Sequence, residues 1–460
     1  MSSNADRTAS TSAETPREQS QSLRLRGDLR ASILDGAAFG GMVGFGETYF
    51  PAFALAVGLG EMAAGMVSSV PLVAGGLMQL ASPLAVKLLR SHRRWVVICA
   101  VIQALSFVPL LIAALAGSIG TTTLLLVAAV YWGAGLATGP AWNTWIGTLV
   151  PPSIRPRFFA NRTRISQAGV FAGFLIGGIL LQYASTNGRS LHAFAILFGV
   201  AGVCRVVSAW MLQRHSEPVP LPANMRQIPW KRVRHHLHAS SGGRLLVYLV
   251  AVQAAAQMAG PFFTPFMLMK LNFSYGDLVG LFSVAFFSKV ISLPAWGRVA
   301  KKIGARQLLW IGGIGIVPLS GGWLVSQNFA WLMFLQVLGG IAWAAYELAF
   351  FLLFFESIAE EERTSVLTIY NLLNTAAWVA GSLVGGLVLS CLDMSFRGYL
   401  IVFGSSSLGR LFALLLLARI PRIVVDSGEV GVRTAAVRPG GSSLDTPVLP
   451  SLPDQIRDGH

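Results

Sequence analysis

The chain has 460 residues, of which 54% are hydrophobic and only 12% charged. This composition excludes an ordinary soluble domain and predicts a protein that crosses a membrane many times. The net charge of +15 does not indicate a nucleic-acid partner, because the basic residues lie in small clusters between apolar runs, a pattern typical of membrane topology. The three cysteines, Cys99, Cys204 and Cys391, are scattered and predict no disulfide framework, metal site or cofactor.

About twelve apolar runs are long enough to cross the ~30 Å hydrocarbon core of a bilayer. We expect them at 32–57, 62–86, 95–117, 122–148, 163–184, 190–213, 245–269, 277–299, 307–326, 330–355, 365–390 and 398–420. They divide the chain into a disordered cytoplasmic tail (1–31), an N-terminal six-helix bundle (32–213), a cytoplasmic linker (214–244), a C-terminal six-helix bundle (245–420) and a cytoplasmic tail (421–460).

Most of the 35 Lys and Arg residues fall on the side of the N-terminus, whereas the opposite side carries Arg189, Lys270 and Arg397. Cytoplasmic segments of membrane proteins hold the excess of basic residues. We therefore expect a multi-pass protein of the cytoplasmic (inner) membrane with both termini in the cytoplasm.

The two halves of the chain match each other in sequence. Phe198-Gly199 and Arg205 match Phe403-Gly404 and Arg410, Pro51 matches Pro265, and Gly169, Gly173, Gly177 and Gly178 match Ala377, Gly381, Gly385 and Gly386. Matches in the same order predict a parallel duplication whose halves are related by an axis along the membrane normal.

A basic loop after the eighth span carries the pattern Gly297, Lys301, Lys302, Gly304 and Arg306. Together with the repeat, this loop resembles that of the major facilitator superfamily, and the likeness covers about residues 30–420. The segment 142–145 is similar to a pattern in a poorly characterised bacterial branch of the same superfamily. The resemblance implies an all-α membrane protein with 12 transmembrane helices in two six-helix bundles related by pseudo-two-fold symmetry. Lys301 stands where the family usually has an Asp that helps to latch the cytoplasmic side.

The glycines of the fifth and eleventh spans have two interpretations. Small residues at intervals of four let membrane helices approach closely, which favours plain packing. They also resemble the antiporter signature of the superfamily, with Phe174 and Ser382 in place of its Pro.

Three charged residues lie near the middle of their spans. At ~1.5 Å per residue, Glu347 lies roughly 14 Å from the end of its helix, and Lys289 and Glu47 lie about 18 Å in. A charge at the centre of a membrane helix costs roughly 2.5–3.5 kcal/mol, so such residues tend to be paired or functional. The family resemblance places spans one, four, seven and ten around a central cavity, with eight beside ten. It implies that Lys289 and Glu347 form an ion pair and that Glu47 faces the cavity without an evident cationic partner.

The pair either holds two helices together or acts as a protonation or substrate switch, whereas Glu47 favours a functional role. Candidates for the cavity wall are Tyr49, Trp132, Asn143, Gln253, Gln257, Trp343, Tyr346, Asn371 and Asn374. A single aromatic residue in a membrane helix is more often a packing or interface residue, but together these side chains indicate an amphipathic cargo. Arg205 and Arg410 are expected to anchor their helices, by reaching the headgroups or by structural pairing.

No P-loop, HExxH or GxSxG motif is present, so the sequence does not predict an enzyme. His235, His236 and His238 in the linker favour an interfacial amphipathic helix over a metal site. We predict a monomeric secondary active transporter that moves a small amphipathic solute across the bilayer by alternating access and is coupled to protons. A facilitated uniporter is one alternative. A non-transporting membrane scaffold, sensor or lipid scramblase with the same fold is another.

Overall fold

The computed structural model describes residues 16–150, 154–217, 241–357 and 360–418. Within these ranges the chain is helical apart from short turns, and it contains no strand. The first bundle consists of α1 (Pro16–Phe45), η1 (Glu47–Tyr49), α2 (Phe50–Ala56), α3 (Gly60–Met66), α4 (Leu72–Leu89), α5 (His92–Leu105), α6 (Phe107–Ala116), α7 (Thr121–Leu149), α8 (Arg155–Thr186) and α9 (Ser190–Arg214). The second consists of α11 (Ser241–Ala259), η2 (Gly260–Phe262), α12 (Phe263–Pro265), η3 (Phe266–Lys270), α13 (Tyr275–Ile303), α14 (Ala305–Ile316), α15 (Pro318–Val325), α16 (Phe329–Ser357), α17 (Glu360–Cys391) and α18 (Phe396–Ala418).

Eleven stretches of the described residues are long and apolar enough to cross a membrane, which agrees with the predicted all-α membrane class. The expected first span is divided, because α1 ends at Phe45 and α2 begins at Phe50. α1 also begins at Pro16, so residues 16–31 form a helix and not the expected disordered tail. Proline at the start of the helix, followed by Glu, Gln, Leu and Arg, favours this early beginning. The predicted linker helix with its three histidines and the C-terminal tail lie outside the described residues.

The first long helix of each bundle breaks at an equivalent position. Gly46 precedes η1 and α2, and Gly260 opens η2, which α12 follows. Pro51 lies in the first turn of α2, and Pro265 ends α12. Because proline has no backbone N–H, it cannot donate to the ladder of a preceding helix. The predicted match between the two prolines therefore corresponds to the same structural feature in both bundles.

The predicted glycine positions are sites of close helix packing. On α8, a Cβ atom at Gly169 would lie 2.8 Å from the carbonyl oxygen of Ala37 on α1. On α17, a Cβ atom at Gly381 would lie 2.2 Å from the carbonyl oxygen of Ala254 on α11. No side chain fits at such distances, and the small residues bring the backbones together as they do in other membrane helix pairs.

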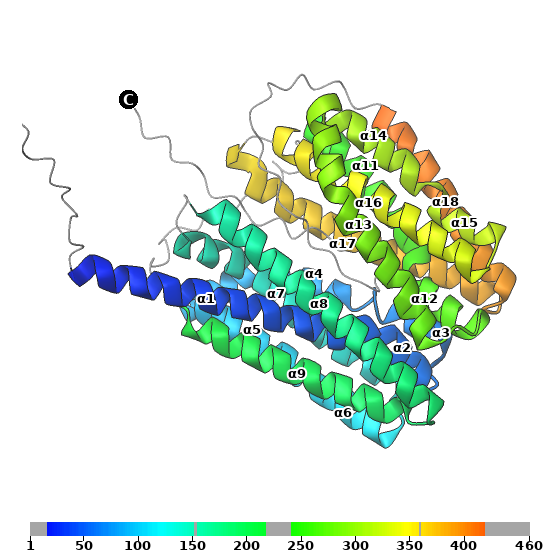
Figure 1. Cartoon of the computed structure of the whole chain (residues 1–460), viewed down its shortest axis with the longest axis horizontal. Helices are drawn as coiled ribbons and strands as arrows, with labels where there is room; N and C mark the ends of the chain where they lie inside the picture. The colour runs from blue at the N-terminus through cyan, green and yellow to red at the C-terminus, as the bar shows by residue number, and fades with distance from the viewer. Residues whose placement is uncertain (1–15, 151–153, 218–240, 358–359, 419–460) are drawn as a thin grey trace, which may run out of the picture.

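The two bundles lie side by side, α1 to α9 in one and α11 to α18 in the other (Figure 1). They touch where α8 meets α13 and where α4 meets α17. At the first of these contacts, Phe171 stacks on Phe286 with ring centroids 4.9 Å apart. α2 and α3 also approach η2 and α12 at the end away from the start of α1 (Figure 1). The bundles are therefore in contact at the end opposite the chain termini.

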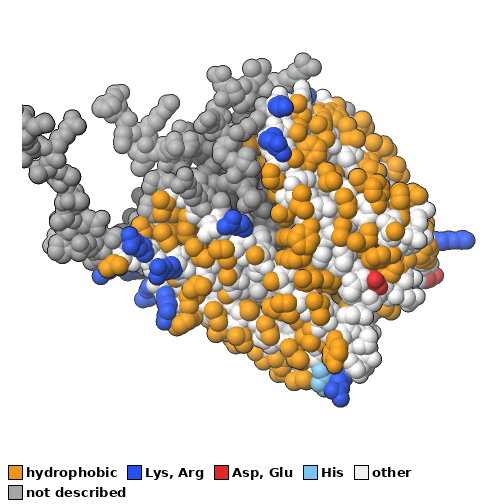
Figure 2. All heavy atoms as spheres, viewed as in Figure 1, with side chains coloured by type: hydrophobic (Ala, Val, Ile, Leu, Met, Phe, Trp, Pro, Cys, Tyr) orange, Lys and Arg blue, Asp and Glu red, His pale blue; other side chains and the backbone are white. Residues whose placement is uncertain are grey.

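The surface of the molecule is apolar over much of both bundles. Figure 2 shows hydrophobic side chains across the visible face, with Lys and Arg mainly at its edges. Ile291 on α13, for example, is 74% exposed. An apolar surface of this extent needs a partner, and in a membrane the lipid chains cover it.

Candidate functional site

Lys289 on α13 and Glu347 on α16 form the predicted ion pair. The Lys289 Nζ lies 2.6 Å from both Oε1 and Oε2 of Glu347, and the two residues are only 4% and 6% exposed. Gly340 allows the helices to approach, since a Cβ atom there would lie 2.4 Å from the carbonyl oxygen of Ala285. Each charge compensates the other in a site that excludes water, so either one alone would be strongly unfavourable.

Glu47 lies at the break between α1 and α2 and is partly buried. Its Oε2 accepts a hydrogen bond of 2.6 Å from the hydroxyl of Tyr131 on α7. Tyr131 is fully buried and packs edge-to-face on Phe50 and Phe107. The predicted mid-depth carboxylate therefore has a phenol as a partner, and the aromatic residues fix the position of that phenol.

A second buried carboxylate on α1, Asp35, belongs to a polar network that the sequence did not reveal. Its Oδ2 accepts a hydrogen bond of 2.7 Å from Arg162 on α8, and its Oδ1 accepts one of 2.7 Å from Ser208 on α9. Ser208 in turn accepts from Arg205, which is 3% exposed. Arg205 is therefore held by structural pairing and does not reach the headgroups. The signal in the sequence is an acid inside the predicted first span, 32–57.

Arg410, the repeat-related partner of Arg205, is also buried inside its bundle. It is 5% exposed and donates hydrogen bonds to the carbonyl oxygen of Ile316 and to Ser406. Its guanidinium lies 5.7 Å from the ring centroid of Trp343. The alternative that this side chain extends to the headgroups is wrong, because the bundle interior supplies its acceptors.

Three side chains connect the bundles at the end away from the termini. Glu61 on α3 pairs with Lys270 of η3 at 2.7 Å and also accepts a hydrogen bond from the hydroxyl of Tyr399 on α18. Glu61 comes from the first bundle, and both partners come from the second. From the sequence, Lys270 indicated only the orientation of the chain in the membrane, and Glu61 was not predicted as a contact between the bundles.

Two further polar contacts cross between the bundles. Ser69 hydrogen-bonds to Ser382, which joins the segment before α4 to α17. The backbone N–H of Gly276 donates to the side-chain oxygen of Gln182 at 2.9 Å, which joins α13 to α8. These contacts add to the Glu61 cluster in holding the bundles together.

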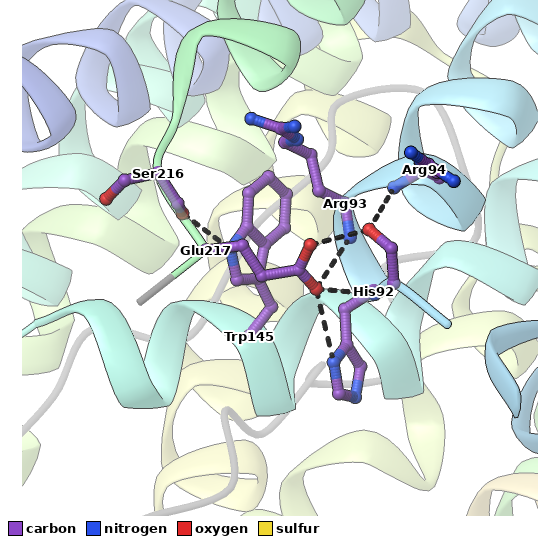
Figure 3. Close-up of polar contacts among 7 residues, drawn as sticks. His92, Arg93, Arg94, Trp145, Ser216 and Glu217 are labelled. Atoms are coloured by element: carbon purple, nitrogen blue, oxygen red, sulfur yellow. Dashed lines mark hydrogen bonds and ion pairs between the residues drawn. The ribbon is translucent and has the colours of Figure 1, made fainter. Parts of the chain in front are cut away.

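Ser216 and Glu217, which follow α9, lie beside Trp145 of α7 and the beginning of α5 (Figure 3). Glu217 accepts hydrogen bonds from the backbone N–H of His92 at 2.7 Å and from the Ser91 hydroxyl at 2.5 Å, at the beginning of α5. The Trp145 indole donates to the carbonyl oxygen of Ser216 at 2.9 Å. A carboxylate at a helix N-terminus satisfies free N–H groups and complements the helix dipole. The start of the linker is therefore fixed to the first bundle.

In the predicted basic loop, the backbone conformation accounts for one of the two glycines. Gly304 separates α13 from α14 with a φ of +85°, a conformation that favours glycine. Gly297 lies within α13, Lys302 is exposed and Arg306 is partly buried. The side chain of Lys301 lies outside the described part of the chain.

Three of the aromatic cavity candidates are packing residues in this structure. Tyr49 is 1% exposed, stacks on Phe174 at 5.7 Å between ring centroids and donates to the Phe174 carbonyl oxygen. Trp343 and Tyr346 are 4% and 5% exposed and contact each other edge-to-face in the core of the second bundle. Large rings fill the space between helices, and in a mostly apolar helix the sequence does not distinguish this use from a cavity wall.

The amide candidates are buried as well. Gln253 and Gln257 on α11 and Asn374 on α17 are 7%, 2% and 1% exposed. Both amide atoms of Asn374 and the Nε2 of Gln253 have no hydrogen-bond partner among the described residues. A buried polar group without a partner costs about 1–3 kcal/mol, so the Asn374 amide and the Gln253 Nε2 keep unused hydrogen-bonding capacity in this structure. Trp132 is partly buried, and the side chains of Asn143 and Asn371 lie outside the described part.

The sequence was compared with models of known protein families. Residues 36–382 and 245–449 match the family model described as the Major Facilitator Superfamily. The chain belongs to the major facilitator superfamily. The members of this superfamily are transporters and not enzymes, which agrees with the predicted class.

Solved structures of the same superfamily fold are similar over most of the chain. A mutant of the nucleoside transporter NupG superposes with a TM-score of 0.67 at 13% identity, over 85% of this chain and 99% of that one. A bacterial homologue of the human lysosomal transporter Spinster, inward-facing and unoccupied, gives 0.60 at 13% identity, over 88% and 96%. A bacterial homologue of the iron transporter ferroportin, outward-facing, gives 0.56 at 15% identity, over 86% and 98%. A search of curated proteins gave no match.

Proposed function

We propose that this superfamily member is a secondary active transporter that moves a small amphipathic solute by alternating access, coupled to protons. The observation that carries the proposal is the buried Lys289–Glu347 pair, whose Nζ and carboxylate oxygens lie 2.6 Å apart inside a membrane-spanning bundle. Ionisable residues in membrane helices are costly to maintain and mark ion and substrate pathways. Glu47, at the break in α1, is the second candidate for proton binding.

The contacts between the bundles support alternating access. Glu61 with Lys270 and Tyr399, and Gln182 with Gly276, all join the bundles at the end away from the termini. We infer that this structure is closed at that end. Opening it requires these polar contacts to break while each bundle keeps its own close glycine packing.

Proton coupling follows from the charge of Glu347. When the carboxylate of Glu347 binds a proton it becomes neutral and no longer compensates the positive charge of Lys289. The free energy of burying the two side chains together then changes. A ligand shifts a conformational equilibrium only by its differential affinity for the two states. We propose that proton and solute occupy the site in different states of the cycle. The unpartnered amide of Asn374 and the unpartnered Nε2 of Gln253 supply hydrogen bonds to polar groups of the solute.

The proposed orientation places both termini in the cytoplasm, in a monomer of the cytoplasmic membrane. The excess of Lys and Arg on the side of the termini supports it. Solute entry and exit then take place between the bundles, and Glu61 lies near the outer surface.

The experiment is transport by the purified protein in liposomes, over a panel of amphipathic solutes, with and without a pH gradient. Glu347→Gln and Glu47→Gln remove the two candidate proton sites. Asp393→Asn is the matched control, because Asp393 is exposed in the turn between α17 and α18 and has a φ of +51°, which Asn tolerates. We expect the control to transport as the unchanged protein does and both Gln variants to lose the response to pH.

Two outcomes would point to the alternatives. Solute flux that follows only the solute gradient, in every variant, would favour a uniporter. Movement of labelled lipid between leaflets without solute flux would favour a scramblase.

A further inference from the structure

A groove of about 570 Å³ lies between α6 and α9 on the outside of the first bundle. α6 contributes Leu111 and Leu115, and α9 contributes residues from His192 to Cys204. None of these residues belongs to the pairs and networks described above, so the groove is separate from the proposed transport site.

The groove is hollow because α9 carries small residues along it. Ala195 and Gly199 form part of its wall. A Cβ atom at Gly199 would lie 3.3 Å from a methyl carbon of Leu111, so a larger side chain there would occupy the space. A larger side chain in place of Gly199 would therefore fill the groove at this point.

The groove opens toward the membrane. α6 and α9 both lie in stretches that are long and apolar enough to span a bilayer. Leu115 and Val203 at its edges are 61% and 64% exposed. Apart from His192 and the thiol of Cys204, every lining side chain is aliphatic or absent, so lipid chains and not water are its natural contents.

The length of the groove matches one leaflet. From His192 to Cys204 the helix rises about 18 Å at ~1.5 Å per residue. One leaflet contributes half of the ~30 Å hydrocarbon core. A single acyl chain that entered at His192 would therefore end near the middle of the bilayer, beside Cys204.

The mouth of the groove is cationic. Arg189 is exposed at the beginning of α9, and His192 follows one turn later, also exposed. Figure 2 shows a His side chain beside Lys or Arg at the lower tip of the molecule, next to apolar surface. Lys270, another basic residue of this end, is already paired with Glu61. Arg presents a planar set of donors that suits the oxygens of a phosphate.

We propose that the α6–α9 groove is a binding site for one anionic phospholipid, with an acyl chain along Gly199 and the headgroup phosphate at Arg189 and His192. The site lies in the leaflet away from the chain termini. The proposal rests on the groove and its mouth and does not depend on the transport proposal.

The test uses the full-length purified protein and native mass spectrometry after exchange into phosphatidylglycerol or phosphatidylcholine with identical acyl chains. We expect the unchanged protein to retain one phosphatidylglycerol molecule and the Gly199→Leu variant to lose it. Gly404→Leu makes the same change at the repeat-related position of α18, and this control should retain the lipid. Arg189→Gln should weaken retention of phosphatidylglycerol about fivefold, as expected for one basic residue near an anionic lipid. Equal retention of both lipids, or unchanged retention in Gly199→Leu, would overturn the proposal. So would a dimer that disappears in Gly199→Leu, because the groove would then be a contact between two copies.

Discussion

The Nζ of Lys289 lies 2.6 Å from the carboxylate of Glu347, and this contact joins α13 to α16 inside one bundle. Because both residues are almost completely buried, neither charge can be solvated if the other is removed. Variants of the pair can therefore test separately whether it only holds two helices together or also acts as a protonation or substrate switch.

Lys289→Met or Glu347→Gln alone should destabilise the protein, by about 3–5 kcal/mol where a charge is left unpaired. The double variant should regain most of that stability, because no charge remains. Thermal unfolding in detergent measures the free energies, and liposome transport measures the function. A stable double variant that still couples solute flux to the pH gradient would leave the pair a purely structural role.

Glu61→Gln should shift the protein toward states that are open at the end away from the termini. The side chains of Glu61 and Lys270 are 11% and 24% accessible, so their ion pair contributes about 0.2–1 kcal/mol and its loss shifts the equilibrium by about 1.4- to fivefold. Spin labels at Thr186→Cys on α8 and Arg397→Cys on α18 report the separation of the bundles at that end.

The exchange of charges in Glu61→Lys with Lys270→Glu is the matched control and should restore the closed distance. Distances that do not differ between the unchanged protein, Glu61→Gln and the exchange would show that this contact does not hold the bundles together.

Gly44→Ala should destabilise the protein because the new methyl group would lie 2.2 Å from a backbone carbonyl oxygen of α8. Overpacking of this kind costs about 1–3 kcal/mol. Gly139→Ala is the control, since nothing lies within 4 Å of a Cβ atom at Gly139 on α7. Thermal unfolding should separate the two variants. Equal stability would mean that α1 and α8 adjust easily to a wider separation.

His215, just after α9, should make stability depend on pH. It is 0% exposed, its Nδ1 lies 2.8 Å from the carbonyl oxygen of Met211, and Asp28, Asp35 and Arg162 act on it electrostatically. Burial lowers the pKa of His215 below its ordinary value of 6.5, and Asp35 opposes this shift. Below pH 6.5 the unfolded chain therefore binds more protons than the folded one, and stability falls as the pH falls.

Unfolding temperatures at pH 7.5 and pH 5.5 measure the effect of His215. The difference between the two should shrink in His215→Gln and persist in the control His192→Gln, because His192 is exposed. An unchanged difference in His215→Gln would assign the pH dependence to other groups.

The depth of a residue in the membrane could be predicted from the sequence, but the direction of its side chain could not. Counting residues along the helices was enough to place Lys289 and Glu347 at similar depth, and the family resemblance supplied the neighbouring helices. Trp343 and Tyr346 were expected at a cavity and lie in a bundle core. In a membrane helix the lipid-facing side is as apolar as the buried side, so the pattern that reveals direction in soluble proteins is weak.

Contacts between segments that are distant along the chain also could not be predicted from the sequence. Glu61 and Lys270 are separated by most of the first bundle along the chain, and each stands at the end of an apolar run where charges are common. Glu217 lies in a polar linker, where nothing distinguishes a helix cap from a solvated carboxylate. Only the folded arrangement shows that these acids have fixed partners.

The Lys289–Glu347 contact lies within one bundle, whereas the Glu61–Lys270 contact crosses between two. In the transport cycle that we propose, each bundle moves as a rigid body, so the first contact travels with its bundle and the second is made and broken once in every turnover. In that proposed cycle, Lys289 and Glu347 face one aqueous compartment and then the other without separating, and a proton that binds there changes compartment without changing its partner.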